Sequence, residues 1–462
     1  MILACAFALR VGVFAAALWC AKDYTIFYAK DSATYLLPAT ALLTTGTFST
    51  EQRTEIMRTP GYPLLLLPGI KLGHVELITI LLQILLSCGT CYLVYATARH
   101  VFQEERSAIF AALLFSLEPL SILHSVLLLS DTLFVFFVVA ALNRLLCAWQ
   151  EGHWANWVGA ALALAGAVYT RPVGYFLPLV LTLVLMVWAS VKRERKTLFR
   201  AAAFGLLTMS LLIAWQVRNW LATGYAGFST TSELVLYFYH SGAVKAQQQG
   251  LPFYEVVEQL GYYDSAVYFR QHPDQQTWTP GRRYAYLRSE GLRTLQQSPG
   301  ISAQLYTRGI LVMLLDPGVV EYLRLFQQYR KSDRVMNVMA KQGMLAAAQR
   351  VIGENPKLIF FGGLLGGGLL GFYLLSWIGL GRVSLRTNFP LLILLSVGFY
   401  FIAVSGGLIA VSRFRLPLMP LLSIFAGQGI SRCWDWAKRK NLGRNRTDFA
   451  LKTESQENAN QP

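Results

Sequence analysis

About ten apolar runs, each close to the length that crosses a bilayer, alternate with polar segments along this chain of 462 residues. A transmembrane helix needs roughly 20 mostly apolar residues, because the hydrocarbon core is about 30 Å thick. Only 14% of the residues are charged, too few to cover a soluble protein of this size. We therefore predict an all-α polytopic membrane protein. The predicted spans are 1–20, 77–98, 107–126, 131–149, 157–170, 175–191, 198–216, 358–380, 389–409 and 416–432.

The formal net charge of +16 is gathered in short basic blocks beside apolar runs, notably at 192–196 and 438–440. Such blocks are typical of cytoplasmic flanks, where anionic lipid and the insertion machinery retain them. If the amino terminus is cytoplasmic, all of these basic blocks lie on the cytoplasmic side. The sequence thus predicts a multi-pass protein of a plasma membrane, most simply a bacterial inner membrane, with membrane lipids and no nucleic acid as partners.

This threading divides the chain into four parts. Residues 1–216 form an amino-terminal transmembrane catalytic module whose first outer loop covers 21–76, and residues 217–356 form a small extracytoplasmic cap. Residues 357–437 hold the carboxy-terminal transmembrane helices, and the basic tail 438–462 is expected to be cytoplasmic and disordered. An apolar run at 309–320 is too short to span and ends at a Pro-Gly turn.

The six cysteines all lie in or beside apolar segments. A disulfide framework would need them in the outer loops. Cys88 and Cys91 have C-x-x-C spacing, but no second pair or nearby His accompanies them. The pattern indicates small residues at helix contacts.

Six charged residues from separate parts of the chain fall at the outer membrane face in this threading. Charges near a bilayer cost free energy, so a group of them at one rim of a bundle indicates a wet cavity. Each residue also has an ordinary structural interpretation, such as a helix cap for an Asp or an interfacial anchor for an Arg. The residues are Asp31, Arg58, Asp131, Arg171, Arg218 and Arg413.

Local sequence supports this grouping. Asp31 precedes a predicted short amphipathic helix at 35–43 that ends near Gly46, and Asp31 or Ser32 could cap it. Arg58 begins a segment whose two prolines and glycine fix a rigid bend, from which an Arg can fork two N–H groups onto a phosphate. Arg171 lies in a tight turn between two spans.

His124 and Glu118 lie near the outer end of the third span. A His with nearby carboxylates could hold a divalent metal, but the spacing matches no standard ligand set. A buried His in a polar cavity is the simpler interpretation, and we predict no metal site and no certain cofactor.

In order along the chain, these motifs resemble those of the GT-C glycosyltransferases. The residues that carry the resemblance are Asp31 with Tyr35, the bend from Arg58 through Tyr62 to Pro63, Ser130-Asp131, Arg171-Pro172, Arg218-Asn219 and the segment Arg413-Phe414-Arg415-Leu416-Pro417. Within that superfamily the chain is most similar to the branch that holds the protein O-mannosyltransferases and lipid A aminoarabinose transferases. The resemblance covers nearly all of the chain except 225–356.

The resemblance implies a GT-C-type bundle that transfers a sugar, with inversion, from a polyprenyl-phosphate donor to a protein, lipid or glycan acceptor on the outer side. It implies catalytic roles for Asp31 and Asp131 and binding of the donor phosphate by Arg58, Arg171, Arg218 and Arg413. Substrate-positioning roles fall on Tyr35, Tyr62, Asn219 and His124. Many relatives carry an Asp-Glu pair where this chain has Asp31-Ser32, which leaves acceptor and metal use open.

The residue types fit that chemistry on their own. Cations stabilise a phosphate leaving group as its charge develops, and a carboxylate within hydrogen-bond reach can take the proton of an acceptor hydroxyl. Two other functions remain open. A transporter or flippase of lipid-linked sugars would use the rim charges to bind a headgroup, although such proteins usually show repeats and a midplane site, for which Arg10 is the plainest candidate. A polysaccharide polymerase or ligase would place similar arginines in a large outer loop.

Overall fold

The computed structural model describes residues 1–462 except 52, 330–348, 351, 382–387, 408–409 and 460–462. The amino-terminal part contains α1 (Ile2–Ala21), η1 (Tyr24–Phe27), α2 (Ser32–Thr45), β1 (Ser49–Thr50), β2 (Arg53–Thr54), α3 (Gly61–Lys71), α4 (Val75–Phe102), α5 (Glu105–Ser116), α6 (Pro119–Val126), α7 (Asp131–Glu151), α8 (Trp154–Thr170), η2 (Pro172–Gly174), α9 (Leu177–Val191) and α10 (Arg195–Thr223). The remainder contains α11 (Thr231–Leu234), the π-helix η3 (Val235–Ser241), α12 (Gly242–Gln249), α13 (Phe253–Gln259), α14 (Ser265–Gln271), η4 (Pro273–Thr277), α15 (Pro280–Gln297), α16 (Pro299–Leu315), α17 (Val319–Leu325), α19 (Lys357–Leu380), α20 (Phe389–Ser405), η5 (Ser412–Leu418) and α21 (Met419–Ala459).

The structure confirms the predicted all-α polytopic architecture. Six described helices are long and apolar enough to cross a membrane, and the pair α5 and α6 together forms a possible seventh span bent by 51°. Helices α8, α20 and the first part of α21 coincide with the other predicted runs at 157–170, 389–409 and 416–432. The total of about ten spans stays a prediction.

The core of the bundle lies between α4, α5, α7 and α8, with α20 and α21 packed against them. Helix α7 is central because apolar residues occur on most of its faces, and Phe134 and Val139 are almost completely buried. Phe134 meets Phe401 of α20 edge to face, with ring centroids 5.8 Å apart. The amino end of α7 is thereby fixed against a helix from the far end of the chain.

The first outer segment folds back onto the bundle through α2, the two-residue hairpin β1–β2, and α3. Helix α2 ends at Gly46, which has φ +70°, as expected for a helix stop. Gly61 begins α3 beside the end of α8. A Cβ at Gly61 would lie 2.7 Å from the Tyr169 carbonyl oxygen, so only glycine allows this approach. This contact brings the bend that carries Arg58 next to the turn that carries Arg171.

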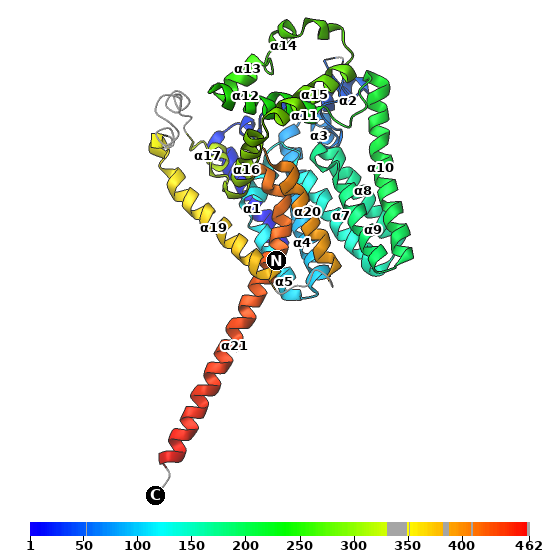
Figure 1. The fold of residues 1–462 in the computed structure, drawn as a ribbon. Coiled ribbons are helices and arrows are strands. Elements are labelled where there is room, and N and C mark those ends of the chain that lie inside the picture. The colour runs from blue at the N-terminus through cyan, green and yellow to red at the C-terminus, as the bar shows by residue number, and fades with distance from the viewer. Residues whose placement is uncertain (52, 330–348, 351, 382–387, 408–409, 460–462) are drawn as a thin grey trace.

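Helices α11 to α15 lie across one end of the bundle, close to α2 and α3, and belong to the predicted cap (Figure 1). Their core is strongly aromatic, with Tyr237, Phe238 and Tyr268 buried together. The apolar run near 309–320 belongs to α16, which ends at Leu315, and Asp316 follows it. The first cap residues directly continue α10, which ends seven residues later than the predicted span, at Thr223.

Helix α21 continues from the bundle as one helix to Ala459 and projects away from it (Figure 1). Beyond Arg439 the sequence contains several good helix formers and no proline before Pro462. The disorder expected for the tail at 438–462 stays a prediction.

Candidate active site

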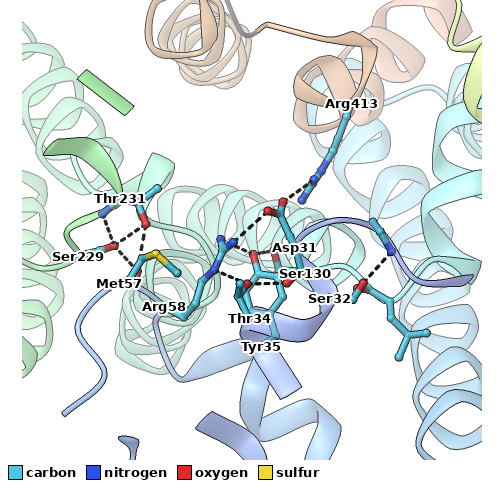
Figure 2. A network of polar contacts seen from close by, with 12 residues as sticks. Asp31, Ser32, Thr34, Tyr35, Met57, Arg58, Ser130, Ser229, Thr231 and Arg413 are labelled. Carbon is cyan, nitrogen blue, oxygen red and sulfur yellow. Dashed lines mark hydrogen bonds and ion pairs between the residues drawn. The ribbon is translucent and has the colours of Figure 1, made fainter. Parts of the chain in front are cut away.

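Asp31 and two arginines form one half of a charged cluster. Asp31 Oδ1 accepts a hydrogen bond from Arg58 Nη2 at 3.0 Å, and Asp31 Oδ2 accepts one from Arg413 Nη1, also at 3.0 Å (Figure 2). The Asp31 side chain is 37% exposed. Asp31 is at the N-cap position of α2 but makes no capping hydrogen bond with its side chain. Its carboxylate therefore serves the cluster, and the helix-cap interpretation is not what the structure shows.

Asp131 forms the other half of the cluster. Its Oδ1 pairs with Arg171 Nη1, and its Oδ2 accepts from Arg413 Nε at 2.8 Å. Asp131 is the first residue of α7 and is only 3% exposed. Arg413 thus binds both carboxylates, one from the first outer segment and one from the core of the bundle. Five residues far apart in sequence meet here as the sequence predicted.

Neighbouring side chains hold Arg58 in a fixed direction. Arg58 Nε donates to Thr34 Oγ1 at 2.9 Å, and its guanidinium carbon lies 4.5 Å from the centre of the Tyr35 ring. The Tyr35 hydroxyl lies 3.0 Å from Ser130 Oγ, beside Asp131. Because Thr34 and Tyr35 follow Asp31 on α2, one helix turn presents both the carboxylate and the support for its arginine partner.

The backbone of the Arg58 bend is fixed by Glu55, a residue that sequence reasoning missed. Glu55 Oε1 accepts from the backbone N–H groups of Met57 at 2.6 Å and Arg58 at 2.8 Å. Ser229 Oγ and Thr231 Oγ1 from the cap donate to the Met57 carbonyl oxygen at 2.6 and 3.0 Å (Figure 2). A lone Glu in a loop gives no sequence signal for this role. The cap and the bend are joined at the residue beside Arg58.

The cluster faces a cavity of about 860 Å³. Its lining includes all five residues of the cluster, namely Asp31, Asp131, Arg58, Arg171 and Arg413. The cap supplies much of the facing wall, and several of its residues carry polar groups that no sequence motif indicated; these are Tyr225, Ser232, Glu233, His240 and Arg288. A cavity of this size is within the range of small-molecule sites.

The cap wall has distinct electrostatic properties. Glu233 is 5% exposed, and its Oε2 accepts from Ser232 Oγ at 2.8 Å. Burial lowers the pKa of His240, so this imidazole is neutral near pH 7. His240 lies in the π-helix η3, a helix form that often occurs at functional sites. The cap can therefore offer a carboxylate, an uncharged imidazole and the exposed Arg288 to a second substrate.

The cluster itself is positively charged, since three arginines and two carboxylates sum to +1. Burial raises the pKa of Asp31, but Arg413 and Arg58 outweigh it and hold that pKa below its usual range. Asp31 is thus ionised at neutral pH. A net positive cavity with paired arginines suits an anion such as phosphate.

Two predicted residues lie outside this cluster. Arg218 Nη1 donates to the Glu55 carbonyl oxygen at 2.6 Å and Nη2 to that of Phe48 at 2.9 Å, and the guanidinium stacks on Trp215. Asn219 Nδ2 donates to the carbonyl oxygens of Gly227 and Phe228 at 3.0 and 3.1 Å. Neither residue lines the cavity. Both hold loops around it, so this geometry gives no support to phosphate binding by Arg218.

Tyr62 and His124 are also behind the cavity wall. Tyr62 is fully buried, donates to Gln83 Oε1 at 2.7 Å and meets the Tyr35 ring edge to face at 5.0 Å. It supports Tyr35 and does not face the cavity. His124 is 2% exposed, and its Nδ1 has no hydrogen-bond partner among the described residues. Sequence placed these residues near the site but could not give the direction of their side chains.

Of the two possible metal ligands, Glu118 is engaged in a helix cap. Glu118 accepts from the backbone N–H groups of Leu120 and Ser121 and so caps α6. Within the described part of the chain, no three His, Cys, Asp or Glu side chains are grouped as a metal site. Asp31 and Asp131 already face three guanidinium groups, whose charge opposes a divalent cation. This donor set fits an anion better than a metal.

Arg10, the candidate for a midplane transport site, is bonded inside the bundle. Its Nε donates to Ser87 Oγ at 2.8 Å and its Nη2 to Ser121 Oγ at 3.1 Å. Its Nη1 donates to the carbonyl oxygens of Ala6 and Ser116. Arg10 is fully buried and does not line the described cavity. Its contacts join α1, α4 and the break between α5 and α6.

Comparison with known proteins supports the resemblance that the motifs indicated. Residues 57–215, about a third of the chain, match the family described as dolichyl-phosphate-mannose-protein mannosyltransferase. The matched part includes Arg58, Asp131 and Arg171, while Asp31 and Arg413 lie outside it. The match agrees with the resemblance to the GT-C glycosyltransferases that the motifs indicated. No curated protein matches the chain.

Solved structures of similar proteins include two membrane proteins. The oligosaccharyltransferase AglB from Archaeoglobus fulgidus, in complex with an inhibitory peptide and a dolichol-phosphate, has 13% identity and TM-score 0.48, with 96% of this chain and 52% of that chain covered. ArnT from Cupriavidus metallidurans bound to undecaprenyl phosphate has 16% identity and TM-score 0.36, with 91% and 77% covered. This chain spans about half the length of AglB. Both TM-scores indicate a loose overall likeness, so the site and the family match must support any functional proposal.

Proposed function

We propose that this protein is an integral-membrane glycosyltransferase that moves a hexosyl or pentosyl group from a polyprenyl-phosphate donor to an acceptor hydroxyl at the outer membrane face. One observation supports this most strongly. Asp31, Asp131, Arg58, Arg171 and Arg413 come from five separate segments and meet at one cavity beside the cap. The family match over 57–215 favours the same substrate class.

The three arginines would hold the donor phosphate. As the bond from sugar to phosphate breaks, charge grows on the phosphate oxygens, and guanidinium groups at fixed positions stabilise that charge most in the transition state. Arg58 and Arg413 are 16% and 17% exposed, so their donors can reach a ligand in the cavity. The Arg171 side chain is 18% exposed, so it can reach the same ligand. Mostly buried arginines lose less rotamer freedom on binding than free surface ones.

Asp31 would act as the general base. Its pKa is low while Arg58 and Arg413 are paired with it, which makes it a weak proton acceptor before the donor binds. A donor phosphate that competes for the same two guanidinium groups would neutralise part of their charge. The pKa of Asp31 would then rise, because less positive charge would oppose the effect of burial. Direct attack by the activated hydroxyl on the anomeric carbon inverts its configuration.

The cap would select the acceptor. It supplies the wall opposite the arginines, and Glu233, His240 and Arg288 place a carboxylate, an imidazole and a guanidinium on that wall. These groups bind hydroxyls and amides in general, so they suit a protein, a lipid or a glycan as the acceptor.

The decisive experiment is transfer by the purified protein in detergent or nanodiscs, with a radiolabelled polyprenyl-phosphate sugar as donor. Membrane extract serves as the acceptor source. Label that moves from the lipid to an acceptor, and requires Asp31, supports the enzyme. A protein that binds or translocates the donor across proteoliposomes but never cleaves the sugar-phosphate bond is a transporter, and the proposal fails.

A further inference from the structure

A second group of reactive side chains lies at the end of the bundle opposite the cavity. Cys147 is on α7, sixteen positions after Asp131, so a rise of 1.5 Å per residue separates the two by about 24 Å along the helix. His100 is in the last turn of the neighbouring helix α4. The His100 Nε2 atom lies 3.2 Å from Cys147 Sγ, and His100 Nδ1 lies 2.6 Å from Gln150 Oε1.

The contacts of Gln150 fix which imidazole nitrogen carries the proton. Gln150 Nε2 donates to the His100 carbonyl oxygen at 3.1 Å, which sets the orientation of the amide and turns Oε1 toward the ring. An amide oxygen only accepts, so Nδ1 must be the N–H nitrogen of the neutral ring. Nε2 then presents its lone pair to the thiol. Cys147, His100 and Gln150 therefore form the arrangement of thiol, base and orienting group that activates thiol nucleophiles.

The surroundings place this thiol at a membrane interface. Two residues beyond it, Trp149 stacks against Phe389 with ring centroids 3.9 Å apart, and Trp188 meets the same Phe389 ring at 5.0 Å. The Lys192 ammonium lies 5.3 Å from the Trp188 ring. Tryptophan with flanking lysine is typical of the headgroup level of a bilayer. Cys147 is partly exposed there, whereas Cys91 is buried.

We propose that Cys147 is an S-acylation site that accepts a long-chain acyl group from an acyl thioester. At headgroup level the acyl chain can lie in the bilayer while its polar thioester end reaches the thiol. His100 Nε2 takes the Sγ proton as Sγ attacks the thioester carbonyl carbon. The new bond from Sγ to that carbon forms, the original carbon–sulfur bond breaks, and the departing thiolate recovers the proton from His100. The inference is independent of the proposed transferase reaction.

The chain contains its own controls. Cys5, Cys20 and Cys433 are more exposed than Cys147, and none of them has a His contact among the hydrogen bonds of the described residues. If exposure alone set reactivity, those three would be acylated first. If the His100 contact determines thiol reactivity, Cys147 reacts first although its side chain is less accessible. The two hypotheses thus predict opposite orders.

The test is incubation of the full-length protein in nanodiscs with palmitoyl-CoA at neutral pH, followed by peptide mass spectrometry over time. We expect one hydroxylamine-sensitive acyl group on Cys147, added at least about tenfold faster than at Cys433, with the rate lost in Cys147→Ala. His100→Gln should reduce the Cys147 rate to that of Cys433. Gln150→Leu should reduce the Cys147 rate by an intermediate amount. The imidazole is still present as a base, but it is no longer held in one tautomer.

The same order should appear with iodoacetamide, which reports thiol reactivity without an acyl chain. Size-exclusion behaviour and thermal unfolding of each variant show whether it is folded. Faster reaction at Cys433, Cys5 or Cys20 than at Cys147 overturns the proposal, as does an unchanged Cys147 rate in folded His100→Gln. Rapid alkylation by iodoacetamide without any acyl transfer also overturns it, since the site would then be a reactive thiol but not an acylation site.

Discussion

Two arginines inside this bundle, the buried Arg10 and the half-buried Arg413, show how the same side chain serves different purposes. Arg10 is fully buried, and all four of its hydrogen bonds go to neutral acceptors, namely two serine hydroxyls and two backbone carbonyls. Arg413 is 17% exposed, lines the cavity and pairs with two carboxylates. These neutral acceptors engage four of the five N–H donors of Arg10 without an ion pair, which is the pattern of a structural contact.

The difference lies in what a ligand could displace. The Arg10 contacts stabilise the 51° bend between α5 and α6, and no described cavity reaches them. The Arg413 contacts can exchange one anion for another, because a phosphate can replace a carboxylate as hydrogen-bond acceptor. Charge inside a membrane protein is therefore weak evidence of function until its partners are known.

Removal of a carboxylate from the Arg413 region should have the largest effect. Asp31→Asn keeps the shape of the side chain but removes the proton acceptor, so sugar transfer should fall by about 10²–10⁴-fold while donor binding persists. The measurement is single-turnover transfer with a labelled donor, alongside donor binding. Asp131→Asn is the control. It should reduce the transfer rate less than Asp31→Asn, because Asp131 is 3% exposed and orients Arg171 and Arg413. Near wild-type transfer by Asp31→Asn would remove this residue from the mechanism.

The next effect should come from the arginines that flank Arg413. Arg58→Ala and Arg171→Ala should each weaken use of the donor roughly ten- to a hundredfold, since a hydrogen bond to a charged group contributes about 1.5–3 kcal/mol. Lysine should restore only part of this, because a point charge lacks the guanidinium fork. Titration of the transfer rate with donor concentration provides the measurement. Normal turnover in both alanine variants would make these residues interfacial anchors.

The Arg10 region should respond in stability and not in chemistry. Arg10→Met leaves buried acceptors such as Ser87 and the Ser116 carbonyl without a donor, at about 1–3 kcal/mol for each group. The midpoint of thermal unfolding in detergent should fall, while the transfer rate per folded molecule stays unchanged. The comparison between the two arginines breaks down if Arg10→Met instead loses donor affinity at an unchanged unfolding midpoint.

The smallest effect concerns pH. Arg413 and Arg58 lower the pKa of Asp31 in the folded protein, whereas an unfolded Asp has a pKa of about 3.9. The ionised Asp31 therefore adds stability above the unfolded pKa, and this contribution disappears as pH falls through the lower folded pKa. Thermal midpoints between about pH 6 and pH 3 should decline less steeply in Asp31→Asn than in wild type. Arg10→Met should keep the wild-type slope, and an equal slope in Asp31→Asn would contradict the prediction.

The sequence predicted which residues lie at the same end of the bundle better than it predicted the direction of their side chains. Asp31, Arg58, Asp131, Arg171 and Arg413 were placed at one face from the order of apolar runs and basic blocks, and the structure brings them together. That pattern gives a height along the bundle, but successive residues on a helix point about 100° apart. Arg218 and Asn219 lie at a similar predicted depth and yet turn toward loops.

The cap could not be predicted in the same way. Its contributions, including Glu233, His240 and Arg288, come from α11, η3 and α15, whose packing depends on tertiary contacts among aromatic rings. Glu55 illustrates the same limit, because its importance depends on two backbone N–H groups that only the folded bend presents to it. The apolar runs, by contrast, are set by bilayer thickness and can be found without knowledge of their neighbours.

The single guanidinium shared by Asp31 and Asp131 has a kinetic consequence. While Arg413 is bound to both carboxylates, neither is free to assist an acceptor, so an acceptor that arrives first meets an unprepared site. A donor that draws Arg413 onto its phosphate removes the one partner that the two carboxylates share, and leaves Asp31 with Arg58 and Asp131 with Arg171. Under the proposed function, substrates would then add in a compulsory order, donor before acceptor. Initial-rate plots would intersect, and a donor analogue would be needed before any acceptor analogue could bind tightly.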